Sequence, residues 1–168
     1  MDAHLTALLI DRPLIYSSLY DLAAVIFGSE GLAKQSTGDH RDEFDKLRIQ
    51  HEVGQATKLL IEIAVVLRNL IDGEQWPLDV IHEIRVESRP EEAVGVLRVA
   101  GESDGELSFR EACNKLIHAQ RISFGMQDLA GKVSFLNGIV ELQGSKSKKN
   151  WIAKIDLSKF IRMAVRQL

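Results

Sequence analysis

The sequence predicts a mostly helical α+β domain, a helical bundle with a small three-stranded antiparallel β-meander before its C-terminal helix. Apolar residues recur every three or four positions in several segments of residues 1–120. The period changes to two between residues 132 and 156, and the helical period returns over residues 157–168. We therefore expect a single domain over residues 1–168, made of a helical core, a meander and a terminal helix in that order.

Two helices are expected in the first half of the chain. The first is indicated by four apolar residues at helical spacing, Ile15, Leu19, Leu22 and Ile26. We expect Gly28 to end it and a polar loop to follow over residues 29–39. The second helix is expected over residues 40–72, with Asp39 as its N-cap and Gly73 as its C-terminal residue. Its seam alternates steps of four and three through Ile49, Val53, Ala56, Leu60, Ile63, Leu67 and Leu70.

The middle of the chain is less regular. Residues 78–86 fit a short helix, and the valine-rich residues 93–100 fit either a helix or a strand. Ser108 and Glu111 have the spacing of a capping box and predict a helix from about residue 109 to 120. The apolar side of that helix consists of Phe109, Ala112, Cys113, Leu116 and Ile117.

The first two strands of the expected meander surround an Asn-Gly pair. Residues 132–136 and 139–143 flank Asn137 and Gly138. Such a pair between apolar runs is the strongest short-range signal for a hairpin turn. We therefore expect a tight turn at these two residues.

The rest of the meander leads into the last helix. A polar turn is expected at residues 144–150 and a third strand at residues 151–156. Asp156 is placed to cap the final helix. The apolar stripe of that helix is Phe160, Ile161, Ala164, Val165 and Leu168.

Composition and charge narrow the class of protein. The chain has 168 residues, is 45% apolar, carries a net charge of −3 and contains one cysteine. No intrachain disulfide can form, which suits a reducing compartment. The N-terminus lacks the basic and long apolar segments of a signal peptide, and no apolar run is long enough to span a membrane. We therefore expect a cytoplasmic protein without a membrane partner, and one that does not bind long nucleic acid through net charge alone.

A polar stripe marks the expected helix at residues 109–120. Arg110, Asn114, His118 and Arg121 follow one another at spacings of four, four and three. At the α-helical repeat they fall within an arc of about 80°, opposite the apolar side. Arginine binds phosphate through paired hydrogen bonds, and histidine transfers protons near neutral pH. The stripe therefore predicts a site for a phosphate-bearing ligand, either RNA or a nucleotide.

The stretch REACNKLIHAQ at residues 110–120 resembles the motif helix of the HEPN superfamily of helical RNases and nucleotide-binding proteins. By this resemblance Asn114 and His118 match the family's polar residue and histidine. The position of the family arginine holds Cys113, and Arg110 lies one helical turn earlier. Either Arg110 takes that role from the same face, or the chain is a non-cleaving relative.

The resemblance also implies an activity and an assembly. It implies a metal-independent endoribonuclease without a cofactor, acting as a homodimer in a bacterial defence or toxin–antitoxin setting. Arg110 would bind phosphate, His118 would transfer the proton, and Asn114 would orient one of them. Arg121 would add positive potential. The long seam of the helix at residues 40–72 is compatible with packing in a bundle or in a dimer.

The same residues are compatible with a second function, that of a non-enzymatic protein-interaction module. In that interpretation the polar stripe is a fixed network of ion pairs. Lys146, Lys148 and Lys149 are additional candidates for substrate binding. They fit either a solvated turn or a phosphate-contacting tip beside Trp151. Trp151 itself is expected to lie in the core and to pack on the last helix.

Neither a metal site nor a reactive thiol is expected. His51-Glu52 and His82-Glu83 lack the second histidine of a His-Glu-x-x-His motif. Cys113 lies on the apolar side of its helix, where a buried hydrophobic role is more natural than a nucleophilic one.

Overall fold

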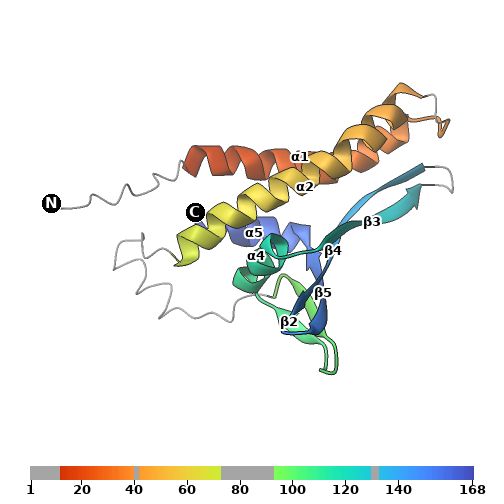
Figure 1. The fold of residues 1–168 in the computed structure, drawn as a ribbon. Helices are drawn as coiled ribbons and strands as arrows, with labels where there is room; N and C mark the ends of the chain where they lie inside the picture. Colours follow the sequence, from red (N-terminus) through yellow and green to blue (C-terminus); the bar gives the residue numbers. More distant parts are fainter. Residues whose placement is uncertain (1–11, 40–41, 73–92, 130–132) are drawn as a thin grey trace.

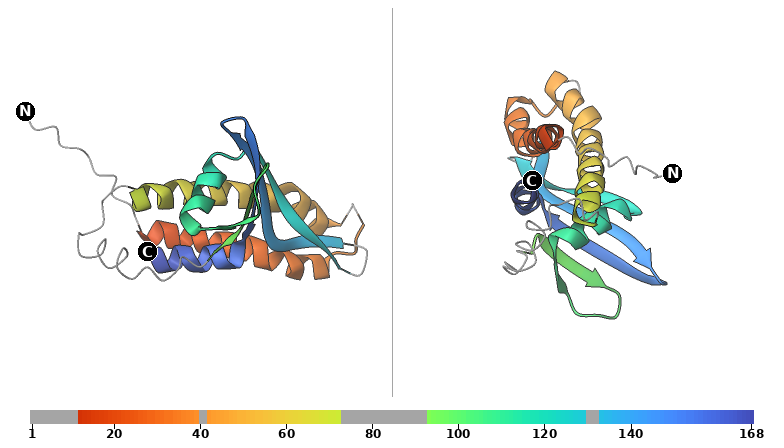
Figure 2. Two further views of the ribbon diagram at one scale, coloured as in Figure 1. Left: turned by 90° about the horizontal axis from the view of Figure 1, so that it is seen from below. Right: turned by 90° about the vertical axis from the view of Figure 1, so that its left-hand side faces the viewer.

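A computed structural model describes residues 12–39, 42–72, 93–129 and 133–168 (Figure 1). In these residues two long helices, α1 (Arg12–Gln35) and α2 (Glu43–Asp72), are followed by the shorter helices α4 (Phe109–Ile117) and α5 (Leu157–Gln167). The strands are β1 (Gly95–Val99), β2 (Gly105–Leu107), β3 (Arg121–Leu129), β4 (Val133–Lys146) and β5 (Lys149–Asp156). They form one antiparallel sheet in the order β2-β1-β5-β4-β3. Helix α1 packs between α2 and β4, and α5 packs beside α1 on β4 and β5 (Figure 2).

This architecture shows that the predicted fold class is wrong. The sheet has five strands instead of three, because β1 and β2 extend it beyond β5 and β3 extends it beyond β4. Residues 93–100, which the sequence left open between helix and strand, contain β1. Residues 121–129 form β3, where no strand was expected. The predicted short helix at residues 78–86 and the predicted terminal Gly73 lie outside the described residues.

The predicted turn at Asn137 and Gly138 is a bulge inside one bent strand, β4. The pairing of β3 with β4 shifts between Phe124 and Met126, so that one residue of β3 faces three of β4. Gly138 has a φ of +81°, and Asn137 Oδ1 accepts a hydrogen bond from the backbone N–H of Ile139 at 3.0 Å. An Asn-Gly pair provides the positive φ that a bulge needs as readily as the one that a turn needs. The Asn-Gly pair thus marked a real change in backbone conformation, but this change lies within one strand and not in a turn between two strands.

The true hairpin turn lies ten residues further on. Ser147 and Lys148 have φ values of +50° and +68° and connect β4 to β5, inside the polar turn expected at residues 144–150. The strand predicted at residues 151–156 is confirmed as β5, with Trp151 and alternate residues buried. Asp156 caps α5 as predicted, because its side chain accepts a hydrogen bond from Lys159 N at 3.1 Å.

The two long helices differ from the prediction at their ends. Helix α1 continues through Gly28 to Gln35, and Ser29 and Ala33 of the predicted polar loop are buried. Helix α2 begins at Glu43, and its N-cap is Asp42 instead of Asp39. The carboxylate of Asp42 accepts hydrogen bonds from the backbone N–H groups of residues 44 and 45 at 2.9 and 3.2 Å. Among the described helices none has the length and apolar character needed to cross a membrane.

The predicted apolar seam of α2 is buried over only part of its length. From Ala56 onward its members lie in the core and pack against α1. Ile49 and Val53, at the start of the seam, are 78% and 45% exposed. The buried side of this first part of α2 carries charged residues instead. The seam therefore serves the intrachain core.

Those charged residues form a network around Arg48. Its guanidinium lies 3.2 Å from Asp45 Oδ1 and 3.3 Å from Glu52 Oε1, and it also donates a hydrogen bond to the backbone carbonyl of Ser134. The side chains of Arg48, Asp45 and Glu52 are each about nine-tenths buried or more. Charges removed from water at this depth need partners.

Ser29 connects the network to α1 and to the sheet. Its hydroxyl donates to Glu52 Oε2 at 2.8 Å and accepts from Leu136 N at 3.0 Å. Ser29 and Arg48 thus bind the backbone of β4 just before the bulge, from two different helices. We refer to Ser29, Asp45, Arg48 and Glu52 as the buried network.

Replacing Arg48 by methionine should destabilise the fold strongly. The variant keeps most of the side-chain volume but leaves two buried carboxylates facing each other without a cation. We expect the free energy of unfolding to fall by about 3–5 kcal/mol, as for other broken buried ion pairs. Denaturant unfolding of Arg48→Met measures this change, with Lys46→Met on the exposed side of α2 as the control. A loss no larger than that of the control would show that the network does not hold the fold.

Candidate functional site

Helix α4 carries most of the predicted site and is shorter than expected. Its N-cap is Ser108, whose hydroxyl accepts a hydrogen bond from Glu111 N at 3.3 Å, which confirms the expected start. The helix ends at His118, a C-cap whose N–H donates to the carbonyl of Asn114 at 3.1 Å. Arg121 is therefore not on this helix but is the first residue of β3.

The sheet places Arg121 away from the rest of the predicted stripe. In the register of the sheet Arg121 pairs with Gln143, Gln143 with Ile152, and Ile152 with Arg98. Directly paired residues point to the same face of a sheet. In the next row, the central residues Leu142 and Ala153 are fully buried beneath the helices. Arg121 thus lies on the open face of the sheet, whereas α4 packs on the covered face.

Asn114 lies at the centre of a polar network. Its side-chain carbonyl accepts a hydrogen bond from Arg68 Nε of α2, and its amide nitrogen donates to Glu111 Oε2 at 3.1 Å. Glu111 Oε1 in turn lies 3.1 Å from Lys115 Nζ. Arg68 was not among the predicted site residues, because helical spacing on α4 gives no information about a side chain from α2. This contact is the structural link between α2 and the predicted stripe.

The β4–β5 hairpin brings a further cation to the same place. Partial burial raises the pKa of Glu111, but hydrogen bonds from Asn114 and Lys115 and the charges of Lys115 and Lys146 outweigh it and lower that pKa. Glu111 is therefore ionised at neutral pH, and two cations lie near it, Lys115 of α4 and Lys146 of β4. We call Arg68, Glu111, Asn114, Lys115 and Lys146 the α4 cluster.

The indole ring of Trp151 packs against this cluster. Lys115 Nζ lies 4.5 Å from the centre of its indole ring, in a cation–π contact. On the other side the ring lies against Gly144, the residue paired with Trp151, where a Cβ atom would collide with the indole. Trp151 is buried, as predicted, but its described contacts are with Gly144 and Lys115 of α4.

The other predicted residues on α4 have separate positions. Arg110 and His118 are both exposed, and eight helical positions place them about 12 Å apart along the axis. Asn114 lies between them. Cys113 points into the core, and burial raises the pKa of its thiol to about 12. The expectation that Cys113 is a buried hydrophobic residue is confirmed, since a thiol with this pKa is protonated at neutral pH.

The three lysines at the hairpin differ in their surroundings. Lys146 and Lys149 are paired across the last rung of the ladder, and Lys149 forms an ion pair with Glu102 at 2.8 Å. Lys148 lies in the exposed turn. Of the three, Lys146 joins the α4 cluster through the effect of its charge on the pKa of Glu111.

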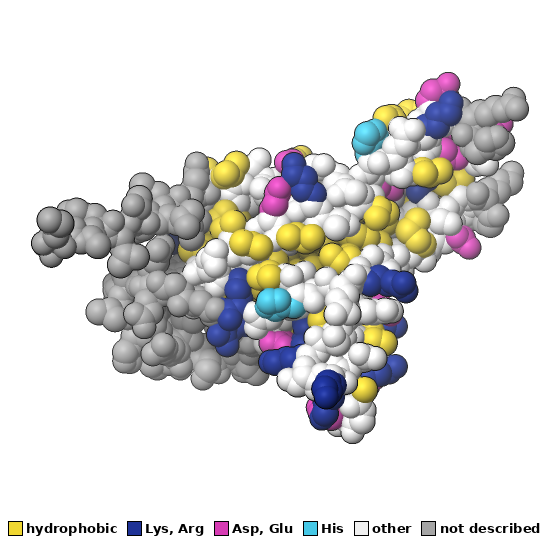
Figure 3. Space-filling model, viewed as in Figure 1, with side chains coloured by type: hydrophobic (Ala, Val, Ile, Leu, Met, Phe, Trp, Pro, Cys, Tyr) yellow, Lys and Arg dark blue, Asp and Glu magenta, His cyan; other side chains and the backbone are white. Residues whose placement is uncertain are grey.

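A charge asymmetry along the sequence would have pointed to this region. Residues 93–168 contain 12 Lys and Arg against 7 Asp and Glu, whereas residues 1–92 contain 9 against 17. The net charge of −3 thus hides halves of about +5 and −8. Figure 3 shows Lys and Arg side chains gathered over the part of the molecule that carries α4 and the β-hairpin. An opposite charge in the two halves is a sign of local anion binding that the total charge conceals.

Metal ligation finds no support in the described part of the chain. Within it no three His, Cys, Asp or Glu side chains are grouped so that they could hold a metal ion. His51 is exposed on α2, while its neighbour Glu52 belongs to the buried network. His82 and Glu83 lie outside the described residues.

Comparisons with known proteins identify no relative. A scan against protein families, a search of curated proteins and a search of solved structures each find no match. The resemblance of residues 110–120 to the HEPN motif helix therefore stays a prediction.

Proposed function

We propose that this protein binds the phosphate backbone of single-stranded RNA at the α4 cluster. The observation that carries the proposal is the convergence of cations on two neighbouring side chains of α4: Arg68 of α2 binds Asn114, while Lys115 of α4 and Lys146 of β4 lie near the carboxylate of Glu111. A bound phosphate would take up the positive charge that Glu111 only partly balances. The resemblance to the HEPN motif helix favours RNA over other phosphate-bearing ligands.

The surroundings of the cluster suit a flexible strand better than a rigid duplex. Arg110 and His118 extend the polar surface along α4 on either side of Asn114, and Lys148 extends it at the hairpin turn. The backbone of a single-stranded RNA can bend, so that its phosphates can reach cations on three separate elements of the protein. Such contacts position a nucleic acid without reading its sequence.

Cleavage of the bound RNA is an extension of this proposal. His118 is the predicted site residue that can transfer a proton near neutral pH, and it is exposed at the end of α4. Arg68, fixed by Asn114, is a nearer partner for His118 than Arg110, because Asn114 lies one helical turn from His118. In this scheme Arg68 takes the phosphate-binding role that the resemblance assigns to Arg110.

Single-stranded RNA should bind with an affinity that depends on Lys146 and on salt. We expect Lys146→Ala to weaken binding and to make the slope of log affinity against log salt shallower by about 0.7, the loss of one phosphate contact on a single strand. Glu111→Gln should strengthen binding, because it removes the anion that repels phosphate. Fluorescence anisotropy of a labelled mixed-sequence RNA over a series of salt concentrations measures both changes.

Matched controls separate this site from general charge effects. Lys58→Ala removes an exposed lysine from α2, and Glu106→Gln removes an exposed carboxylate from β2. If these controls change the affinity as much as the cluster variants do, RNA does not bind at α4. Incubation of the same RNA in excess EDTA tests cleavage. Metal-independent cleavage should leave 2′,3′-cyclic phosphate ends, and these ends should be absent after incubation with His118→Ala.

The outer face of α1 favours a second function, self-association. Between residues 13 and 29 this helix contains one charged residue, Asp21. Its inner side is buried, while Leu14, Tyr16 and Tyr20 on its outer side are exposed. Helices that are apolar around their circumference are normally covered on both sides. We therefore infer a homodimer that pairs the outer faces of two α1 helices and leaves the α2 seam inside each chain.

Sedimentation velocity tests this dimer directly. The wild-type chain should sediment at about twice its mass of 18.8 kDa, and Tyr20→Lys should sediment as a monomer because it buries a charge at the pairing face. Val96→Lys, at an exposed apolar position on β1, should remain a dimer. A monomeric wild type, or equal behaviour of the two variants, would exclude pairing through α1.

A further inference from the structure

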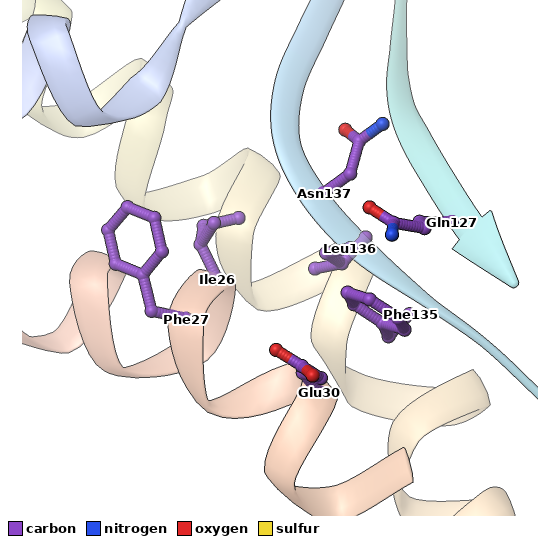
Figure 4. A pocket seen from close by; sticks show the side chains of 7 residues that line it. All are labelled: Ile26, Phe27, Glu30, Gln127, Phe135, Leu136 and Asn137. Carbon is purple, nitrogen blue, oxygen red and sulfur yellow. The ribbon is translucent and has the colours of Figure 1, made fainter. Parts of the chain in front are cut away.

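A second concave site lies between α1 and the bulge of β4, and none of its lining residues belongs to the α4 cluster. The pocket has a volume of about 280 Å³, close to the lower end of typical small-ligand sites. Its lining contains Ile26, Phe27 and Glu30 of α1, Phe135, Leu136 and Asn137 of β4, and Gln127 of β3, with Ile26 and Leu136 between the two aromatic rings in the view of Figure 4. The lining thus combines two aromatic rings and two aliphatic side chains with one carboxylate and two amides.

The β4 wall of this pocket is fixed from behind. Arg48 donates to the carbonyl of Ser134 and Ser29 accepts from the N–H of Leu136, so the residues on both sides of Phe135 are bound by the buried network. The adjacent bulge orients Asn137, the next residue of this wall. Asn137 Oδ1 is held by the N–H of Ile139 at 3.0 Å.

The bulge also brings backbone and aromatic groups close together. Gly125 of β3 lies so near the amide of Asn137 that a Cβ atom there would collide with it. Gly138 lies against the ring of Phe27, which would be 3.6 Å from a Cβ atom at that glycine. Bulges of this kind often occur beside binding sites, where they redirect a side chain. The β4 backbone that frames the pocket and the side chain of Asn137 therefore have defined positions.

We propose that this pocket binds a nucleobase that carries an exocyclic amino group. Aromatic side chains offer faces on which a planar heterocycle stacks. Asn and Gln amides both donate and accept, which matches the mixed edge of a base. Glu30 adds an acceptor, and a carboxylate recognises the amino group of cytosine in the same way.

Glu30 decides which bases fit. Its Oε1 lies 2.8 Å from Lys34 Nζ, and an ionised carboxylate has lone pairs for further donors. An amino group donates to it, whereas a carbonyl at the same place on the ring would repel it. Cytosine and adenine should therefore bind in preference to uracil and hypoxanthine. This preference is a property of α1, β3 and β4, and is separate from phosphate binding at α4.

Titration with nucleosides tests the pocket without any phosphate. Cytidine and uridine form one matched pair, and adenosine and inosine form another, since each pair exchanges an amino group for a carbonyl. In NMR spectra of the ¹⁵N-labelled full chain, an amino-bearing nucleoside should shift the side-chain amide resonances of Gln127 and Asn137. These shifts should reach saturation as the nucleoside concentration rises. Its affinity should exceed that of its partner by about tenfold, the usual effect of a hydrogen bond to a charged group.

Glu30→Gln should abolish this preference. The matched control is Glu62→Gln, because both glutamates are exposed on a helix and each forms an ion pair with a lysine four residues away. The control should keep both the shifts and the preference. Failure of all four nucleosides to bind, equal affinity within each pair, or equal behaviour of the two variants would overturn the proposal. Because nucleosides lack phosphate, none of these results depends on the α4 cluster.

Discussion

The burial of Arg48 between two carboxylates is the interaction on which the rest of this structure depends. In the first part of α2 the buried residues are charged, while apolar residues such as Ile49 face solvent. A hydrophobic contact would tolerate sliding of the hairpin along the sheet. Directional bonds from Ser29 and Arg48 to two specific backbone groups of β4 do not. The network thus sets where the helices meet the sheet.

The bend of β4 follows from this attachment. Before the bulge, β4 has to reach the helical hairpin to satisfy the network, and after the bulge it has to remain paired with β5. The Asn137-Gly138 bulge reconciles these two requirements. As a result one strand contributes to two different surfaces, the pocket beside α1 and, through Lys146, the α4 cluster. Recognition of a base at one and of phosphate at the other would be joined by the same strand.

Elements with local signals were predictable from the sequence. Ser108 and Asp156 are side-chain caps that act within three residues, and both mark their helices as expected. The alternation of β5 and the period of α2 also gave the right secondary structure. These signals are reliable because each one satisfies backbone groups or buries a face within its own segment.

Features that depend on distant partners were not predictable in the same way. Ser29 looks like a loop residue, but its bond to Leu136 spans 107 positions. The Asn-Gly pair has the same conformation in a turn and in a bulge, so only the pairing of β3 decides between them. Of the predicted stripe, Arg110 and Asn114 lie on α4 and His118 is its C-cap, but Arg121 belongs to the other face of the sheet. Arg68 enters the site from α2, which no spacing within α4 could show.

Hydrogen exchange at Leu136 tests whether the buried network holds β4 to the helices. Its amide donates to Ser29, whereas the amide of Asp156 donates to Val94 within the sheet and serves as the internal reference. In Ser29→Ala the exchange of Leu136 should accelerate at least about fivefold relative to Asp156, as expected when a buried donor loses its acceptor at a cost of 1–3 kcal/mol. An unchanged ratio of the two rates would contradict the account, because β4 would then be held without the network.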